Sequence, residues 1–480
     1  MALRGISAEL LMETAGLEAL RIIKTQLRTL SPIAVLSGPG NNGADGLVVA
    51  RHLLSCGFNP QVFFIGDSKK VSPLFTLQRQ RLEAMGGKIG KLADLSHLKE
   101  FNTFVDALFG IGLERPLEGE FLDVVSFLNS SKKRIVSLDI PSGLNATSGR
   151  VMNVAVKASL TLTFGLAKPG LLSSEGSECC GKVKVLSLGI PQDIIDTFAK
   201  SHFLVTRSWV RPLIPTRKNT SNKFTYGRLY ILAGRPGTWG AAALSAKGAY
   251  RIGAGYVTLV VQDKKTAKAY LGHHLGPEVL TTSIDDESIF KKASAVVVGP
   301  GAGESEDLKG FIRRLRKENL RHVVLDADAL TALSQMRDFE PLPSWILTPH
   351  TGELSRLLNI SSKEIEAARF ESVLKAVQKF KCGVLLKGFH SQFCDSEGRI
   401  GIINSGNAAL AKAGTGDVLS GFIGGLMSQS LLPSDATMVG AYLHGFIADK
   451  WIEGGQNIKS FVASDLITHI SSALTQVERG

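Results

Sequence analysis

The sequence predicts an α/β protein with two domains, each built on a mostly parallel sheet covered by helices. Apolar runs alternate with glycine-rich turns and helix-like segments along most of the chain. A length of 480 residues is enough for two or three domains with separate cores. The alternation is interrupted at Trp209–Lys223, where Pro212, Pro215 and a polar run are typical of a connection. We therefore expect one domain at 1–208 and a second at 209–480.

The individual elements follow from the apolar runs. The first half predicts strands at Pro32–Leu36, Val62–Ile65, Thr103–Ala107, Arg134–Leu138, Leu160–Phe164 and Val183–Leu188. A glycine-rich loop follows the first of these strands, and we expect a helix from Gly46 to about Ser55 after it. The second half predicts strands at Leu229–Leu232, Tyr256–Val261, Ala295–Val298, His322–Leu325, Trp345–Leu347 and Val384–Leu386.

The composition is typical of a globular protein of the cytoplasm. The N-terminus has no long apolar run before Glu9, and the uncharged stretch 418–434 contains Gln429 and Pro433, so we expect neither a signal peptide nor a membrane helix. Five cysteines without CxxC spacing fit a reducing compartment. The net charge of +12 permits nucleic-acid binding, but the basic residues are scattered, which favours attraction of phosphorylated small molecules. We expect no nucleic-acid partner and no membrane partner, and we expect a homo-oligomer.

The loop after the first strand carries two overlapping signals. The glycines of Gly38–Gly43 match GxGxxG, so an ordinary dinucleotide-binding dehydrogenase is one interpretation. The loop also contains Asn41, Asn42 and Asp45, which a plain pyrophosphate site does not need. Amides and a carboxylate here indicate a polar ligand or a cation, or alternatively a set of helix caps.

Two aspartates follow neighbouring strands of the same series. Asp106 lies at the end of Thr103–Ala107, and Asp139 directly follows Arg134–Leu138. Ligands of open α/β sheets bind beyond the carboxyl ends of the strands. Either aspartate alone is more typical of a turn, but together with the asparagine loop they predict one shared cleft.

Four motifs of the first domain resemble the NAD(P)H-hydrate epimerase family. They are Leu11-Met12-Glu13-x-Ala15-Gly16, Asn41-Asn42-Gly43-Ala44-Asp45-Gly46, Gly110-x-Gly112-Leu113-x-Arg115-Pro116 and Asp139-Ile140-Pro141-Ser142-Gly143-Leu144. Two positions depart from the family's usual residues, because Ala44 stands for a glycine and Asn145 for an aspartate. The resemblance implies a Rossmann-like, doubly wound sheet and the interconversion of the R and S forms of hydrated NADH and NADPH.

The same resemblance implies roles for particular residues. It implies substrate contacts from Asn41, Asn42, Gly43, Ala44, Asp45, Gly110, Ile111, Gly112, Leu113, Glu114 and Arg115. It implies a potassium ion near Asn42, Asp106 and Ser142, whose oxygen atoms suit a hard cation. It also implies that Asp139 is the substrate-facing acid or base, a catalytic role that its position at a strand end permits.

In the second half, Gly414-Thr415-Gly416-Asp417 indicates a definite chemistry. The glycines leave the backbone free to surround an oxyanion, and a helix that begins near Gly416 aims its N–H groups at that point. Asp417, in the first turn, can take the proton of a hydroxyl that attacks a terminal phosphate. Phosphoryl transfer needs such an anion site and one base, although an aspartate in a first turn is also a common cap.

This segment resembles the ribokinase-like superfamily, and further motifs narrow the resemblance to the ADP/ATP-dependent NAD(P)H-hydrate dehydratases. They are Gly299-Pro300-Gly301-Ala302-Gly303, Leu325-Asp326-Ala327-Asp328-Ala329-Leu330, Leu347-Thr348-Pro349-His350-Thr351-Gly352-Glu353, Leu386-Lys387-Gly388 and Ala463-Ser464-Asp465-Leu466. The resemblance runs from about Arg228 to the end of the chain, and it implies a ribokinase-like α/β sandwich.

The second resemblance also implies a set of contacts, with Asp417 as the catalytic base. The hydrated cofactor would contact Ala242, Gly303, His350 and Asp417. The nucleotide would contact Lys387, Gly388, Phe389, His390, Ser391, Gly414, Thr415 and Gly416. The implied nucleotide is ADP with Mg²⁺, which Glu353 would help to place, and the choice between ADP and ATP stays open.

Together the two resemblances imply a bifunctional repair enzyme that epimerises the hydrates and dehydrates the S form while ADP becomes AMP and phosphate. Two alternatives stay open. One is a ribokinase-like kinase for a small vitamin precursor, with a ligand-binding, regulatory first domain. The other is a first domain that binds a nucleotide or RNA without catalysis. A stable phosphorylated product would indicate the kinase, and free phosphate would indicate the repair enzyme.

Overall fold

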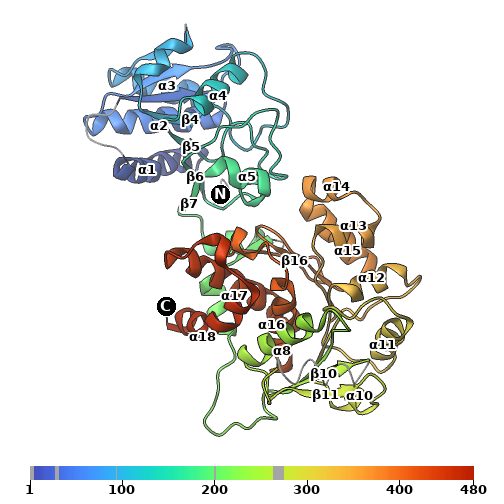
Figure 1. Cartoon of the computed structure of the whole chain (residues 1–480). Coiled ribbons are helices and arrows are strands. Elements are labelled where there is room, and N and C mark those ends of the chain that lie inside the picture. Colours follow the sequence, from blue (N-terminus) through green and yellow to red (C-terminus); the bar gives the residue numbers. More distant parts are fainter. Residues whose placement is uncertain are drawn as a thin grey trace. The chain divides into compact units, whose positions relative to one another are not determined.

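The computed structural model describes residues 5–26, 32–92, 94–198, 202–262, 267 and 275–479. The chain divides into two compact units, Met1–Thr197 and Phe198–Gly480. Each unit is built around one large sheet with helices packed against it (Figure 1). The expected two-domain α/β architecture is confirmed.

The sheet of the first unit has seven strands in the order β3-β2-β1-β4-β5-β6-β7, and every neighbouring pair is parallel. The strands are β1 (Ile33–Ser37), β2 (Gln61–Phe64), β3 (Ile89–Lys91), β4 (Thr103–Ala107), β5 (Arg134–Leu138), β6 (Leu160–Phe164) and β7 (Lys182–Leu186). The six expected strands are confirmed, whereas the sequence does not predict β3, whose Ile-Gly-Lys stretch has no apolar run. The order reverses between β1 and β4, which is where ligands bind in open α/β sheets.

Helices cover both faces of this sheet. They are α1 (Ala8–Gln26), α2 (Asn41–Ser55), α3 (Pro73–Ala84), α4 (Glu120–Ser130), α5 (Ser174–Cys180) and α6 (Gln192–Phe198). The first three pack with Val35 and Val105 on one face, whereas α4 packs with Ala34 and Phe104 on the other. These strand residues alternate because successive side chains point to opposite faces. Helix α2 begins earlier than the expected Gly46.

The second unit contains a ten-stranded sheet in the order β11-β10-β9-β12-β13-β14-β15-β16-β17-β8. Its strands are β8 (His202–Val205), β9 (Arg228–Leu232), β10 (Tyr256–Val261), β11 (Leu280–Ser283), β12 (Ala295–Val298), β13 (Val323–Leu325), β14 (Ile346–Leu347), β15 (Gly383–Leu386), β16 (Gln392–Cys394) and β17 (Ile400–Ile403). The six expected strands are confirmed. The sequence does not predict β8, β11, β16 and β17, which are short. β16 is antiparallel to both of its neighbours, so the sheet is mixed at this end.

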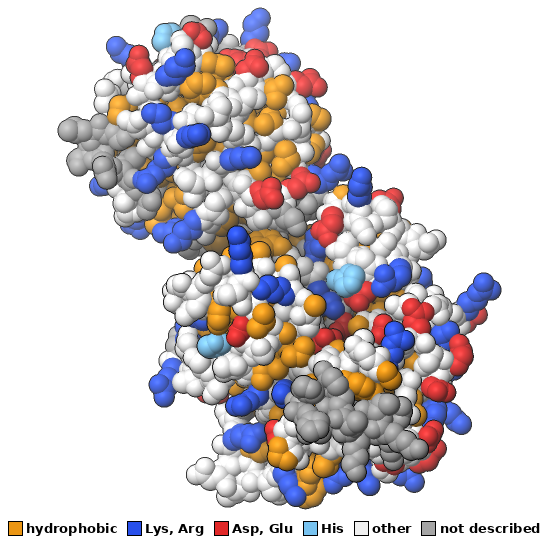
Figure 2. Space-filling model, in the orientation of Figure 1, with side chains coloured by type: hydrophobic (Ala, Val, Ile, Leu, Met, Phe, Trp, Pro, Cys, Tyr) orange, Lys and Arg blue, Asp and Glu red, His pale blue; other side chains and the backbone are white. Residues whose placement is uncertain are grey.

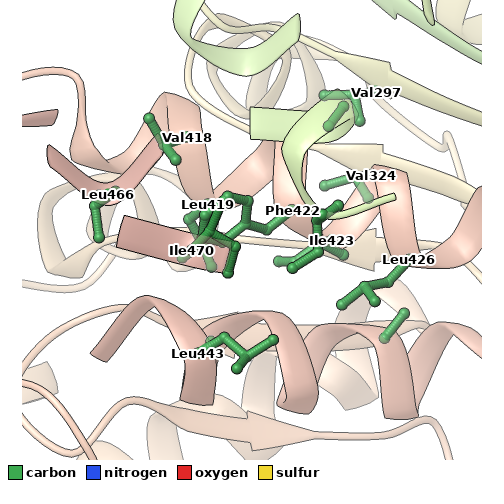
Figure 3. Close-up of a cluster of buried hydrophobic side chains, with 14 of the residues drawn as sticks. Val297, Val324, Val418, Leu419, Phe422, Ile423, Leu426, Leu443, Leu466 and Ile470 are labelled. Atoms are coloured by element: carbon green, nitrogen blue, oxygen red, sulfur yellow. The ribbon is translucent and has the colours of Figure 1, made fainter. Parts of the chain in front are cut away.

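The helices of the second unit lie on both sides of its sheet (Figure 1). They are α7 (Arg207–Val210), α8 (Trp239–Arg251), α10 (Ser288–Lys292), α11 (Glu306–Lys317), α12 (Asp328–Gln335), α13 (Thr351–Leu358), α14 (Ser362–Ala367), α15 (Arg369–Phe380), α16 (Thr415–Ser428), α17 (Pro433–Glu453) and α18 (Ala463–Arg479). Figure 3 shows the main core, where α16 packs with α17 and α18 against Val297 and Val324 of the sheet. Residues 418–428 of α16 are all buried, which explains the uncharged stretch. Within the described ranges, no helix is long and apolar enough to cross a membrane.

The second unit begins earlier than the sequence predicts. β8 (His202–Val205) pairs with β17 and is therefore an edge strand of the second sheet. Val210 and Ile214 are buried in the core of the same unit. The expected boundary between 208 and 209 is therefore corrected, and Trp209–Lys223 belongs to the second unit instead of connecting two domains. Pro212 lies in a short 3₁₀ turn between the buried residues Val210 and Ile214, and Pro215 follows Ile214. Composition does not reveal that such a polar, proline-containing segment packs on a core.

The charged side chains of the surface are mixed in sign. On the face that Figure 2 shows, Lys and Arg side chains are interspersed with Asp and Glu and form no continuous basic stripe. This agrees with the scattered distribution of basic residues in the sequence.

Candidate active sites

The first candidate site lies beyond the carboxyl ends of β1 and β4, where α2 begins. The Asn41–Asp45 segment forms the first turn of α2. A Cβ at Gly38 would lie 1.9 Å from the carbonyl oxygen of Leu108, and one at Gly43 would lie 1.8 Å from that of Gly38. These two glycines therefore let chain segments approach each other closely. Their packing role accounts for the GxGxxG pattern without a dehydrogenase-type pyrophosphate site.

Asp106 joins three strand ends through a chain of hydrogen bonds. Its buried carboxylate accepts hydrogen bonds from Ser142 Oγ at 2.6 Å, Ser142 N at 2.9 Å and Ser137 Oγ at 2.7 Å. Ser142 Oγ in turn accepts one from Phe109 N at 2.9 Å, and Asn42 Nδ2 donates to the Phe109 carbonyl oxygen at 2.9 Å. The structure thus brings together Asn42, Asp106 and Ser142.

This network leaves one oxygen atom available to a cation. The side-chain oxygen of Asn42 is buried and has no hydrogen-bond partner. Burial raises the pKa of Asp106, although hydrogen bonds from Ser142 and Ser137 oppose this shift, and a nearby positive charge would stabilise its ionised form. Amide, hydroxyl and carboxylate oxygens suit a hard cation. The described residues contain no group of three or more His, Cys, Asp and Glu side chains that could hold a metal ion.

Asp139 directly follows β5 and adopts a left-handed backbone conformation with φ of 65°. Its Oδ1 accepts hydrogen bonds from Phe164 N at 3.1 Å and Lys168 Nζ at 2.5 Å. Thr163 Oγ1 at 3.0 Å and the Phe164 carbonyl oxygen at 2.9 Å hold the same ammonium group. No described residue donates a hydrogen bond to Oδ2 of Asp139, so this oxygen is free to act on a ligand.

Asp45 shares this part of the site. Burial and the negative charge of Asp139 raise the pKa of Asp45 well above its usual range, and Lys168 only partly opposes them. A protonated Asp45 beside the Asp139–Lys168 pair is therefore favoured. Sequence reasoning missed Lys168. The available signal was its position shortly after β6, which parallels the positions of Asp106 and Asp139 after their strands.

The other predicted contacts of the first site differ in their exposure. The exposed ones are Asn41, Ile111, Gly112, Glu114 and Arg115, and Gly110 packs against Asn42. The side chains of Ala44 and Leu113 lie in the cores on the two faces of the sheet. These two residues can contact a ligand only through their backbone.

The structure explains both departures from the family's usual residues. Ala44 lies inside α2 with its methyl group buried, so this position does not need the conformational freedom of glycine. Asn145 Nδ2 donates a hydrogen bond to the Leu113 carbonyl oxygen at 3.2 Å, and its Oδ1 accepts from Ser148 N at 2.9 Å. The amide thus ties the loop after β5 to the loop after β4, and an aspartate lacks that donor.

The second candidate site is divided by the turn from Gly414 to Asp417 at the start of α16. A cavity of about 530 Å³ on one side is lined by Lys387–Ser391, Thr415, Gly416 and His350, among others. A cavity of about 540 Å³ is lined by Gly414, Asp417 and Asp328, among others. Most predicted nucleotide contacts therefore share the first cavity, and Asp417 opens onto the second. His350, an implied substrate contact, lines the first cavity together with the nucleotide contacts. Gly414, an implied nucleotide contact, lines the second cavity together with Asp417.

Asp417 receives no hydrogen bond from any residue in the described ranges. Burial, reinforced by the charge of Asp326, raises its pKa to about 7, while Lys387 opposes the shift. Lys387 Nζ instead donates to Asp326 Oδ1 at 2.7 Å, and Ser420 Oγ donates to the other oxygen. Burial alone would raise the pKa of Asp326, but Lys387 and these hydrogen bonds hold it below its usual value. Asp417 is therefore the carboxyl that can exchange a proton near neutral pH.

His350 caps helix α13 and at the same time borders the first cavity. Its Nδ1 accepts hydrogen bonds from Gly352 N at 3.0 Å and Glu353 N at 3.3 Å, while Glu353 Oε2 accepts one from His350 N at 2.8 Å. The His350 side chain is still 55% exposed, so it stays accessible to a ligand. Glu353 Oε2 also lies 3.7 Å from Lys387 Nζ.

His444 of α17 holds the start of α16 through a hydrogen bond. Its buried Nε2 lies 3.0 Å from the Thr415 carbonyl oxygen, which can only accept a hydrogen bond, so Nε2 carries the proton. Burial, with a contribution from Lys387, lowers the pKa of His444 to about 4. The ring is therefore neutral at physiological pH and holds the Gly414–Asp417 turn in place.

The remaining predicted substrate contacts lie near the cavity of Asp417. Ala242 is fully buried in α8, and its neighbours Gly240 and Ala241 line the cavity. Gly303 N donates a hydrogen bond to Oδ2 of Asp328 at 2.7 Å. Sequence reasoning assigned no role to Asp326 or Asp328, although both belong to a motif that follows a buried strand.

The fold is that of a two-domain α/β enzyme, with one candidate site at a switch point of the first sheet and another at a glycine-capped helix of the second unit. Residues 229–472 match the NAD(P)H-hydrate dehydratase family, and residues 8–170 match the family described as YjeF-related protein N-terminus. The chain belongs to the bifunctional NAD(P)H-hydrate repair enzymes.

Individual relatives agree with this assignment over nearly the whole chain. The bifunctional NAD(P)H-hydrate repair enzyme of Moorella thermoacetica is 32% identical over 98% of this chain and 93% of its own. That of Escherichia coli is 33% identical over 93% of this chain and 85% of its own. Among solved structures, the ADP/ATP-dependent NAD(P)H-hydrate dehydratase of Bacillus subtilis, co-crystallised with ATP and Mg²⁺, is 28% identical with a TM-score of 0.51. The match covers 57% of this chain and 98% of that one.

Proposed function

We propose that this protein repairs hydrated NADH and NADPH in two steps. The first unit interconverts the R and S hydrates, and the second dehydrates the S form while ADP becomes AMP and phosphate. One observation carries the proposal: Asp417, with a pKa raised to about 7 by burial, opens onto a second cavity beside the one formed by the predicted nucleotide contacts. The five cysteines are free thiols, which supports a cytoplasmic location.

In the second unit, Asp417 accepts the proton of the hydrate's hydroxyl as its oxygen attacks the terminal phosphorus of ADP. The bond from that phosphorus to the bridging oxygen breaks, and AMP leaves. The phosphorylated intermediate then loses phosphate and a ring proton, which restores the double bond. Backbone N–H groups around Gly416 and the ammonium of Lys387 stabilise the charge that develops. Mg²⁺ would neutralise charge on the phosphates, and Glu353, a buried carboxylate, would help to hold it.

In the first unit, Asp139 and Asp45 form a base and an acid on one substrate. Oδ2 of Asp139 takes the proton of the hydroxyl while Asp45 gives a proton to the ring nitrogen, and the carbon–nitrogen bond breaks to an open-chain aldehyde. Reclosure on the other face of that aldehyde, with both proton transfers reversed, yields the opposite epimer. Lys168 positions Asp139 and neutralises its charge, and the raised pKa of Asp45 favours the proton-donating form.

A potassium ion held by Asn42, Asp106 and Ser142 is part of this proposal. The unpartnered, buried oxygen of Asn42 and the buried carboxylate of Asp106 support it. Such an ion would supply positive charge between the groups that follow β1, β4 and β5. Replacing K⁺ by tetramethylammonium should therefore slow epimerisation and lower the thermal stability of the first unit, while dehydration of the S hydrate persists. Equal epimerisation and melting in both salts would contradict the ion site.

The dehydratase activity is tested by product analysis. Purified S hydrate, ADP and Mg²⁺ are incubated with the protein, and the absorbance of reduced nicotinamide, AMP and free phosphate are followed together. We expect the three products to appear in equal amounts. A stable phosphorylated product without free phosphate would show a small-molecule kinase instead.

A further inference from the structure

An exposed arginine of the second unit places its side chain against a glycine of a neighbouring loop. Arg235 belongs to the loop between β9 and α8, and its side chain covers Gly303 in the loop after β12. A Cβ added at Gly303 would lie 2.6 Å from Cδ of Arg235 and 2.8 Å from its Nε and Nη1. Gly303 also has a φ of 72°. The missing side chain at Gly303 therefore provides the space that the guanidinium occupies.

The two loops that hold this contact are tied to each other. Gly234 N donates a hydrogen bond to the Pro300 carbonyl oxygen at 2.9 Å, and Thr238 Oγ1 donates one to the Gly301 carbonyl oxygen at 2.7 Å. Thr238 and Gly301 both line the cavity onto which Asp417 opens. Arg235 is therefore held beside this cavity by a preorganised backbone, not by a flexible loop.

This cavity is lined by negative charge, so binding of an anionic substrate there needs a positively charged side chain nearby. Its charged lining residues in the described part of the chain are two carboxylates, Asp328 and Asp417. A hydrated dinucleotide must bring its nicotinamide ring to Asp417, and it carries a negatively charged pyrophosphate. Lys387 is bound to Asp326 and borders the other cavity. Arg235 is exposed, and none of the described side chains forms an ion pair with it.

We propose that Arg235 binds the pyrophosphate of the hydrated dinucleotide and so holds the reactive ring beside Asp417. The proposal rests on the proposed function, because it uses the same substrate cavity. A guanidinium presents several N–H donors to phosphate oxygens at once, which a lysine cannot do with the same geometry. This role also explains the glycine at position 303, since any side chain there would displace the arginine.

The test compares Arg235→Ala with Arg313→Ala, an exposed arginine of α11 that does not line the cavity. For the S hydrate of NADH, we expect Arg235→Ala to raise KM about tenfold or more, as for a charge-assisted hydrogen bond, with kcat changed less than about twofold. KM for ADP should stay the same, and Arg235→Lys should recover part of the loss. Arg313→Ala should behave like the unmodified protein.

A substrate without phosphate separates binding from structural damage. The hydrate of reduced nicotinamide riboside lacks the pyrophosphate, so Arg235→Ala should leave its kcat/KM unchanged. An equal loss on this substrate, or a raised KM for ADP, would overturn the proposal and make Arg235 a structural residue. An unchanged KM for hydrated NADH would also overturn it, and the proposed function would stand as long as Asp417→Asn still abolishes turnover. If the unmodified protein does not dehydrate hydrated NADH, the proposed function itself fails.

Discussion

The two candidate sites combine a lysine with several carboxylates at the ends of strands, but the lysine binds a different partner in each. In the first unit, Lys168 binds Asp139, the residue to which we assign the base. In the second unit, Lys387 binds Asp326 and leaves Asp417 without a hydrogen bond from the described residues. In both sites the carboxyl that the lysine does not bind, Asp45 or Asp417, has its pKa raised by burial. Burial is the main cause of both shifts, and in each site the lysine only partly opposes it.

The largest expected effect comes from removing one carboxylate in each site. Asp417→Asn should slow dehydration of the S hydrate by roughly a hundredfold or more, the scale of a lost general base, with little change in nucleotide binding. Asp139→Asn should slow consumption of the R hydrate to its spontaneous epimerisation rate and leave the S rate nearly unchanged. Rates on the separated epimers measure both effects. Equal slowing of both epimers by Asp139→Asn would indicate one shared site.

Removing the lysine of the second site should destabilise that unit. Lys387→Met leaves Asp326 buried without its countercharge, and we expect the free energy of unfolding to fall by about 3 kcal/mol. The Lys387→Met, Asp326→Asn double variant should regain most of this stability but not the dehydratase activity. All four tryptophans lie in the second unit, so their fluorescence during urea unfolding of the full chain reports on it alone. A double variant as unstable as the single one would show that the ion pair is not the cause.

The raised pKa of Asp417 predicts a pH dependence of dehydration and of the stability of the second unit. Because the base must be ionised, dehydration should fall about tenfold per pH unit below pH 7. The folded pKa of about 7 lies well above the ordinary pKa of an aspartate, 3.8, so the folded state keeps a proton that the unfolded chain has lost. The free energy of unfolding should therefore fall as the pH rises from about 4 to about 7. Asp417→Asn should make this fall smaller, and an unchanged fall in the variant would assign it to other groups, such as Asp435 and Asp449, whose pKa values burial also raises.

The smallest effect concerns the edge of the second sheet. A fragment of residues 198–480 keeps β8, whereas a fragment of residues 210–480 loses it and exposes the side of β17 that β8 covers. Since Val205 of β8 is fully buried, the shorter fragment should be less stable by about 2 kcal/mol. Both should dehydrate the S hydrate, because neither cut touches the cavities. Equal urea midpoints would show that β8 adds nothing to this unit.

The long elements were predictable because apolar runs report burial directly. Strands such as Thr103–Ala107 and Tyr256–Val261 have the predicted bounds. β8 and β16 were not predictable, since strands of three or four residues at one end of a sheet owe their structure to their neighbours. The start of α2 at Asn41 was also missed, because its Asn-Asn-Gly stretch is typical of a loop and becomes helical only where Gly43 can pack against Gly38.

The sequence alone indicated two positions of reactive residues: Asp106 and Asp139 at strand ends, and Asp417 in the first turn of a helix after a glycine-rich turn. The tertiary structure alone decided their electrostatic roles. Lys168 reaches Asp139 across 29 residues of sequence, and Lys387 reaches Asp326 across 61. A pKa depends on burial and on charges within a few ångströms. Neither burial nor such distances can be read from the sequence. The same holds for Arg235, whose contact with Gly303 joins two loops that only the sheet order β9–β12 makes neighbours.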